Sequence, residues 1–175
     1  MKTKVLIVVD MQNDFITGSL GTKEAQAIVP NVVEKIKSWE GDLFLTQDTH
    51  KVNYLSTQEG KFLPIEHCIA LTDGWRIHDD LKEICGPIPT FVKSTFGCTS
   101  LIDTLKELQE AKEIEEIQII GLCTDICVIS NALILKSFFP EVPIVVDANC
   151  CAGSTRENHE KALSIMQACQ IIVER

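Results

Sequence analysis

Short apolar runs recur along the chain and alternate with longer segments of helical periodicity. The first run, residues 5–9, reads VLIVV, and such an unbroken stretch is typical of a strand buried on both faces. Similar runs predict further strands at residues 43–45, 89–92, 117–122, 142–146 and 171–173. The spacing of apolar residues, together with a capping box at residues 154–157, predicts helices at residues 25–39, 100–109, 125–139 and 154–168.

Strands that alternate with helices indicate parallel β-α-β units. We therefore predict an α/β fold: a three-layer, Rossmann-like sandwich with a six-stranded, mainly parallel sheet, in a single domain over residues 1–175. Residues 47–88 break the alternation, because they form a long loop with at most one short helix near 77–84. Loops of this length inside compact domains usually carry function.

Composition and charge exclude several classes of protein. The chain is 45% hydrophobic and 23% charged, as in ordinary globular proteins, and it has no apolar run of about 18 residues that could cross a membrane. With a net charge of −9 and no cluster of Lys and Arg, it lacks the basic surface that nucleic acids require. The N-terminus does not read as a secretory signal, so we expect a cytoplasmic protein.

Eight cysteines are many for a chain of this length. Without a secretory signal, a disulfide framework is not expected, and no C-x-x-C pair suggests a zinc finger or a thioredoxin motif. Most of the cysteines are therefore interpreted as small buried apolar residues. One of them is a candidate nucleophile.

Polar residues follow the predicted strands. In open α/β sheets, ligands bind beyond the carboxyl ends of the strands, so residues at these ends are expected to meet. They are Asp10, Asp48, His50, Lys93, Cys123, Thr124, Asp125, Cys127, Asp147 and Asn149. An acid, a lysine, a cysteine and histidines gathered at one edge indicate a catalytic site.

Cys127 is the candidate nucleophile. With Thr124 or Asp125 as the N-cap, it falls in the first turn of a helix, where free amide hydrogens and the helix dipole favour a thiolate. The same amides could hold an oxyanion. From its position alone, a buried structural cysteine is the main alternative.

Asp10 and Lys93 are candidates for activating this cysteine. Asp10 could be a general base that takes the thiol proton and passes it to a leaving amine, or it could simply cap the loop after its strand. Lys93 could lower the pKa of the acid or hold charge that develops on the substrate. Taken alone, Lys93 also fits an ordinary surface lysine.

Asp48 and His50 are two residues apart, so in an extended segment their side chains leave on the same side. Together with His67, from the same long loop, they form a ligand set that suits Zn²⁺, Mn²⁺ or Fe²⁺. Glu59 could add a ligand directly or through water. The remaining histidines are interpreted as surface residues: His78 and His159.

Three motifs point to one family. The first is DMQNDF at residues 10–15, followed by TGSL at 17–20 and IVP at 28–30; the second is FVKSTF at 91–96, and the third is GLCTDICV at 121–128. In sequence and order they resemble the isochorismatase-like cysteine hydrolases, above all the nicotinamidase/pyrazinamidase branch. The resemblance extends over nearly the whole chain.

The resemblance implies a catalytic triad of Asp10, Lys93 and Cys127. It also implies a non-proline cis peptide bond between Leu122 and Cys123. This bond would turn the Cys123 amide towards the Cys127 amide, so that the two form an oxyanion hole.

Within this superfamily, a metal site separates the nicotinamidases from most relatives. The resemblance assigns Asp48, His50 and His67 as its ligands, with Glu59 near the position of an extra acidic ligand. It implies one divalent ion, with zinc as the first expectation and manganese or iron as alternatives.

The implied reaction is deamidation of nicotinamide to nicotinate and ammonia through a cysteine thioester, with the metal ion positioning the pyridine ring. The partner is thus a small-molecule amide. A homo-oligomer would suit the family, although the sequence shows no interface signal. Residues expected to line the substrate pocket are Phe15, Leu63 and Leu122.

Some positions depart from the family pattern, and they keep other functions open. Leu63 stands near the place of an aromatic residue that packs on the ring, and Glu66 replaces a common proline. Ser94 and Cys123 replace the usual glycine and alanine. The alternatives are an isochorismatase-like hydrolase acting on another small amide, a carbamoyl or ureido compound or isochorismate, and a non-catalytic metal-binding or thiol-sensing protein.

Overall fold

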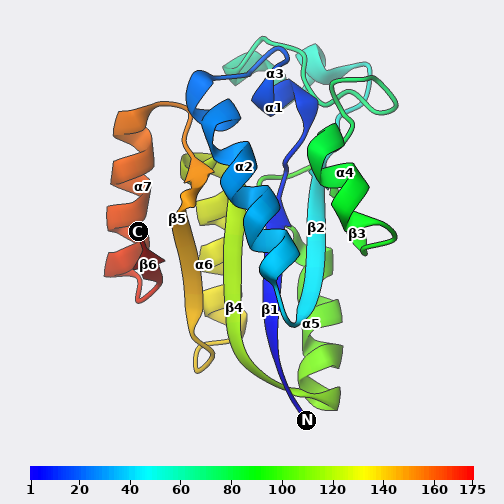
Figure 1. Cartoon of the computed structure of the whole chain (residues 1–175). Coiled ribbons are helices and arrows are strands. Elements are labelled where there is room, and N and C mark those ends of the chain that lie inside the picture. The colour runs from blue at the N-terminus through cyan, green and yellow to red at the C-terminus, as the bar shows by residue number, and fades with distance from the viewer.

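One sheet of six strands forms the middle layer of the protein (Figure 1). The computed structural model describes residues 1–175, and all neighbouring strands are parallel. The strand order is β3-β2-β1-β4-β5-β6, with the bounds β1 (Lys2–Val9), β2 (Asp42–Asp48), β3 (Thr90–Lys93), β4 (Glu113–Leu122), β5 (Ile144–Ala152) and β6 (Ile172–Glu174). The predicted α/β sandwich is confirmed, and its sheet is parallel throughout.

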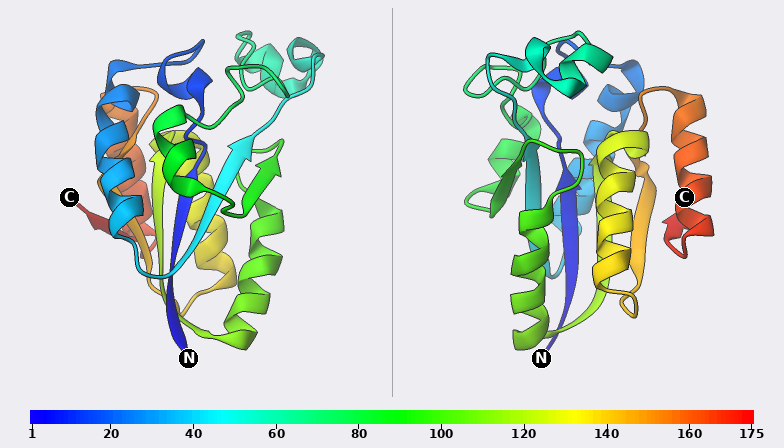
Figure 2. Two further views of the ribbon diagram at one scale, coloured as in Figure 1. Left: turned by 45° about the vertical axis from the view of Figure 1, so that its right-hand side comes forward. Right: turned by 180° about the vertical axis from the view of Figure 1, so that it is seen from behind.

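Helices cover both faces of the sheet (Figure 2). One face buries apolar side chains of α1 (Asn13–Ile16), α2 (Lys23–Ser38) and α4 (Asp79–Cys85), and the other buries those of α5 (Thr99–Ala111), α6 (Ile129–Phe138) and α7 (Arg156–Ala168). The chain also forms α3 (Gln58–Phe62), a 3₁₀ turn at Tyr54–Ser56 and a π-helical turn, η2, at Thr124–Val128. None of the helices has both the length and the apolar content needed to cross a membrane.

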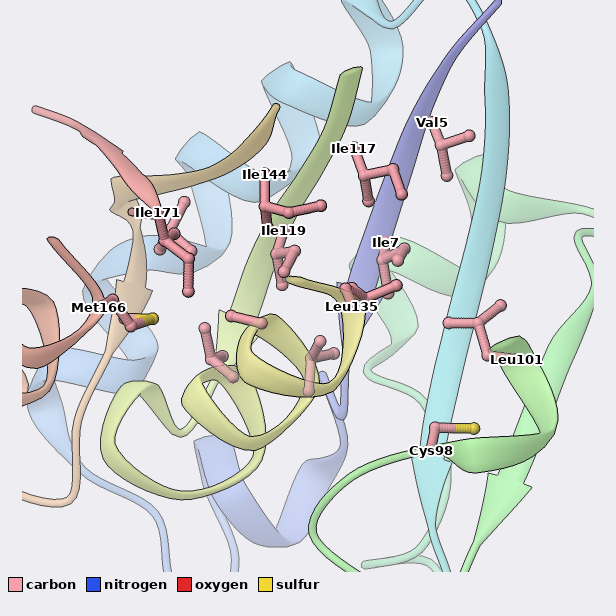
Figure 3. Close-up of a cluster of buried hydrophobic side chains, with 14 of the residues drawn as sticks. Val5, Ile7, Cys98, Leu101, Ile117, Ile119, Leu135, Ile144, Met166 and Ile171 are labelled. Atoms are coloured by element: carbon pink, nitrogen blue, oxygen red, sulfur yellow. The ribbon is translucent and has the colours of Figure 1, made fainter. Parts of the chain in front are cut away.

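The central strands are apolar because they are buried on both faces. In β1, Val5, Ile7 and Val9 point to the layer of α5, α6 and α7, whereas Leu6 and Val8 point to the layer of α2. All five are at most 1% exposed. Figure 3 shows the first of these cores, with labelled residues that include Ile117, Ile119, Leu135, Ile144 and Met166.

The predicted end of the fifth strand is wrong. A strand was expected at residues 142–146, but β5 covers Ile144–Ala152, because its ladder with β4 resumes after a shift in register. Long-range pairing thus overrides a polar sequence that reads as a loop. Asp147 and Asn149 lie inside the strand, and Asp147 forms an ion pair with Lys35 of α2 at 2.8 Å.

The long loop has more local structure than its sequence suggests. Residues 47–88 contain the 3₁₀ turn, α3 and α4, of which only α4 matches the predicted helix at 77–84. The Thr57 side chain caps α3 by accepting a hydrogen bond from the Gly60 amide at 3.0 Å. These short elements shape the part of the loop that approaches the sheet edge.

The two-sided core predicts a large difference between buried and exposed isoleucines. Ile119 is fully buried in β4, whereas Ile165 in α7 is 52% exposed. We expect Ile119→Ala to lower the free energy of unfolding by about 2–5 kcal/mol, because it removes packed atoms and leaves a cavity. Ile165→Ala should change it by only about 0.5 kcal/mol. Urea denaturation measures both, and equal losses would contradict the assignment of the core.

Candidate active site

The carboxyl ends of four neighbouring strands bring the candidate residues together. Asp10 follows β1, Asp48 ends β2, Lys93 ends β3, and Cys127 lies in the η2 turn after β4. All four side chains are buried. Because parallel strands end at the same edge of the sheet, residues far apart in the sequence form one cluster.

Asp10 is oriented by its neighbour on β2. The backbone at Asp10 takes a positive φ of 47°, a conformation that Asp tolerates better than most residues. The Thr46 hydroxyl donates a hydrogen bond to Asp10 Oδ1 at 2.7 Å, and the Oδ2 atom lies 2.6 Å from Lys93 Nζ. The carboxylate therefore faces the cluster and does not cap the following loop.

Lys93 is the cationic centre of the cluster. Besides Asp10, its Nζ atom lies 3.5 Å from Cys127 Sγ and 3.5 Å from Asp48 Oδ1. Burial opposes the charge, but Asp10, Cys127 and Asp48 outweigh it, so the pKa of Lys93 is raised. The alternative of a surface lysine is wrong, because the side chain is only 3% exposed.

Burial raises the pKa of the Cys127 thiol well above its usual value, and the nearby Asp10 carboxylate adds to this effect, while Lys93 opposes it. The expectation that the helix terminus favours a resting thiolate is therefore not met. The N-cap of the turn is Cys123, neither Thr124 nor Asp125. A thiol with a raised pKa needs a base before its sulfur can attack. The pKa of Asp10, the candidate base, is itself raised by burial.

Gly121 allows the end of β4 to reach this position. Its φ is +115°, and a Cβ atom there would lie 2.1 Å from the Val9 carbonyl oxygen. Only glycine has both the conformation and the space for so close an approach. The turn that carries Cys127 therefore starts directly beside β1, the strand that precedes Asp10.

The cis peptide bond between Leu122 and Cys123 is confirmed. The Cys123 amide donates no hydrogen bond to another protein group, while its carbonyl oxygen accepts from the amides of Ile126 and Val128, both at 3.1 Å. An amide free in this way is available to a substrate oxygen.

Asp48, His50 and His67 form a compact group of possible metal ligands. One ligand atom from each lies within 4.8 Å of the others, and all three residues are buried. His67 Nδ1 hydrogen-bonds to the Ile65 carbonyl oxygen at 2.8 Å, which leaves Nε2 as the free nitrogen. His50 Nε2 is buried and makes no well-directed hydrogen bond, and carboxylate oxygens of Asp48 and Glu59 lie 3.0 and 3.6 Å from it. This donor set fits a divalent transition metal.

Two polar residues that sequence reasoning did not single out support this group. The Gln12 side chain accepts from the Asp48 amide and donates to the Asp48 carbonyl, both at 2.8 Å. Asp14 Oδ2 accepts from the Cys68 amide at 2.7 Å and so fixes the residue after His67. Both lie in the DMQNDF motif, and that motif is the sequence feature from which they could have been identified.

A cavity of about 400 Å³ opens over the cluster. The predicted pocket residues Phe15, Leu63 and Leu122 all line it, as do Cys123 and Cys127. Ten of its sixteen lining residues are hydrophobic. The lining residues that the prediction missed include Leu20, Thr22, Phe62, Phe96, Ile126 and Ser154.

Some predicted positions lie away from the cavity. Asp147 and Asn149 do not line it, and His78 and His159, interpreted as surface residues, are half-buried. His78 caps α4 by accepting a hydrogen bond from the Asp80 amide at 3.4 Å. The Nδ1 atom of His159 forms a hydrogen bond of 2.8 Å with the Thr124 hydroxyl in the η2 turn.

Known proteins match the chain over nearly its whole length. The nicotinamidase of Schizosaccharomyces pombe is 26% identical to it, over 96% of this chain and 91% of that protein. A crystal structure of the nicotinamidase/pyrazinamidase of Bacillus subtilis is similar with a TM-score of 0.84 and 26% identity, over 99% of this chain and 100% of that one. For the pyrazinamidase of Pyrococcus horikoshii in complex with zinc, the TM-score is 0.81 and the identity 24%, over 99% of each chain.

The family itself follows from the sequence match. Residues 4–175 match the model of the isochorismatase domain. That span takes in all six strands except the first residues of β1, and it includes every member of the cluster at the sheet edge. The chain therefore belongs to the isochorismatase family.

Proposed function

We propose that the protein is a metal-assisted nicotinamidase that hydrolyses nicotinamide to nicotinate and ammonia. The observation that carries the proposal is the contact of Lys93 with both Asp10 and Cys127, at 2.6 and 3.5 Å, below an apolar cavity. An acid, a cation and a thiol in contact are the parts that covalent hydrolysis of an amide requires. The nicotinamidase of Schizosaccharomyces pombe and the similar Bacillus subtilis enzyme support this choice of substrate.

Asp48, His50 and His67 would hold one divalent ion, and Glu59 is close enough to reach it directly or through water. When bound, the ion supplies a Lewis-acid site that can accept the pyridine nitrogen and so orient the carboxamide. Zinc is the first candidate, because the histidines offer imidazole nitrogens and the pyrazinamidase of Pyrococcus horikoshii binds zinc. Asp48 and His67 line the cavity, so the ion would lie in its wall.

The first half of the reaction forms a thioester. Asp10 accepts the proton of the Cys127 thiol, and the sulfur attacks the carboxamide carbon to form a C–S bond. The amides of Cys123 and Cys127 stabilise the oxyanion. When the C–N bond breaks, Asp10 returns the proton to the leaving nitrogen, and ammonia departs. Lys93 remains charged and keeps Asp10 in place between the two transfers.

The second half hydrolyses the thioester. A water molecule gives a proton to Asp10 as its oxygen attacks the thioester carbon, and the C–S bond then breaks. The same two amides again hold the oxyanion. Asp10 passes the proton back to the Cys127 sulfur, and the carboxylic acid that is released loses its remaining proton to water to become the carboxylate. A thiol and a free base remain for the next cycle.

The apolar wall of the cavity suits a flat ring. Phe15, Phe62, Leu63 and Phe96 all contribute to it. The exposed Glu66, which replaces a common proline, does not line the cavity, so it does not alter the ring wall. Phe62, next to Leu63, adds an aromatic ring to the lining and is 86% exposed to solvent.

The direct test is ammonia release from nicotinamide by the metal-loaded protein. Cys127→Ala should lower turnover by at least about a thousandfold, because it removes the thiol that contacts Lys93 and would form the thioester. Cys169→Ala is the matched control, since Cys169 is an exposed cysteine remote from the cavity, and it should retain full activity. Release of ammonia by Cys127→Ala at more than about a tenth of the wild-type rate would refute the nucleophile.

Metal content tests the ligand group independently of turnover. His50→Ala should lower the bound divalent metal severalfold, because it removes one of three close ligands. His78→Ala, which changes a histidine outside the group, should leave the content unchanged. Elemental analysis of both variants purified in parallel provides the measurement. An unchanged metal content in His50→Ala would exclude the assigned site.

A further inference from the structure

Side chains of the segment between β5 and α7 hold the turn that carries the nucleophile. Thr124 Oγ1, in η2, lies 2.8 Å from His159 Nδ1, in the first turns of α7. Next to it, the Asp125 carboxylate accepts hydrogen bonds from the Ser154 amide at 2.7 Å and the Ser154 hydroxyl at 2.5 Å. Ser154 also lines the active-site cavity, so this segment both walls the cavity and contacts the turn.

The two contacts differ in how well they exclude water. Ser154 is exposed, so water can replace its bonds to Asp125 at little cost. Thr124 is fully buried, and His159 is the partner of its hydroxyl. A buried hydroxyl that loses its partner is costly, so the turn would shift to recover one. The His159 contact is therefore the one that constrains the turn.

Backbone packing fixes the position of His159. A Cβ atom at Gly153 would lie 2.8 Å from the His159 amide nitrogen, so the end of β5 lies directly against the start of α7. Burial lowers the pKa of His159 and so favours the neutral imidazole. A neutral imidazole and a hydroxyl form one hydrogen bond in either tautomer.

We infer that His159 is a positioning residue for the reaction: through Thr124 it holds the η2 turn so that the Cys123 amide and Cys127 keep their places. Thr124 lies directly after Cys123 and three residues before Cys127, so a movement of Thr124 displaces both. The effect that we expect on kcat for nicotinamide rests on the proposed function. It concerns the geometry of the transition state, and His159 itself does not line the active-site cavity.

Two substitutions at the same position separate hydrogen bonding from size. His159→Phe keeps a ring and removes both nitrogens, whereas His159→Asn keeps a polar atom near the place of Nδ1. We expect kcat for nicotinamide to fall at least roughly tenfold in His159→Phe, with KM changed by less than about twofold, because misplaced groups weaken transition-state binding. His159→Asn should recover most of kcat. A role in packing alone would predict the opposite order, because Phe fills the space better than Asn.

A double-mutant cycle connects the effect to Thr124. Thr124→Val removes the same hydrogen bond from the other side, so the double variant with His159→Phe should be no slower than the slower single variant. Independent, multiplicative losses would overturn the inference, as would full kcat in His159→Phe. If His159→Phe does not fold, Thr124→Val alone decides: a loss of kcat supports the inference, and wild-type kcat overturns it.

Hydrogen exchange keeps this test separate from the choice of substrate. If the wild-type protein releases no ammonia from nicotinamide, the proposed function fails, but the amides of residues 124–129 still report on the turn. Faster exchange of these amides in His159→Phe, restored in His159→Asn, supports the positioning role. Equal exchange in the wild type and His159→Phe would overturn it.

Discussion

The buried ion pair between Asp10 and Lys93 is the interaction on which the site depends. An isolated charge in this interior would be strongly unfavourable, and each partner is buried only because the other lies 2.6 Å away. The two residues end strands separated in the sheet by β2, so their side chains meet beyond its end. Thr46 on β2 completes the arrangement by donating to the acid. The strand order β3-β2-β1 therefore allows Lys93, at the end of β3, to reach Asp10, which follows β1.

Burial and this pair together act on the sulfur. Burial raises the pKa of the Cys127 thiol, and the charge of Lys93, 3.5 Å away, opposes this effect but is largely balanced by Asp10. A free lysine at that distance would favour a thiolate. The proposed chemistry therefore needs proton transfer to Asp10, which the sequence argument from the helix terminus alone did not anticipate.

Much of the site could be predicted because it follows from periodicity. Asp10 and Lys93 come directly after an apolar run, Asp48 and Cys127 follow theirs within five residues, and the ends of parallel strands must meet. The parts that could not be predicted depend on long-range contacts. The continuation of β5 requires pairing with β4, and the burial of His159 requires the approach of α7 to η2. A local sequence pattern holds no information about either partner.

Two buried polar atoms of the site are bonded less well than the rest of the interior. Two buried side-chain polar atoms make close contacts with charged groups but no well-directed hydrogen bond: Asp10 Oδ2, which lies 2.6 Å from Lys93 Nζ, and His50 Nε2. Native interiors satisfy nearly all such atoms, and the exceptions need a reason. Here one belongs to the candidate base beside the thiol, and the other faces Asp48 and Glu59 at 3.0 and 3.6 Å. A base must keep an open lone pair for a proton, and a ligand must keep one for a metal. At both atoms the fold provides a contact with a charged group in place of a directed hydrogen bond, as the proposed chemistry requires.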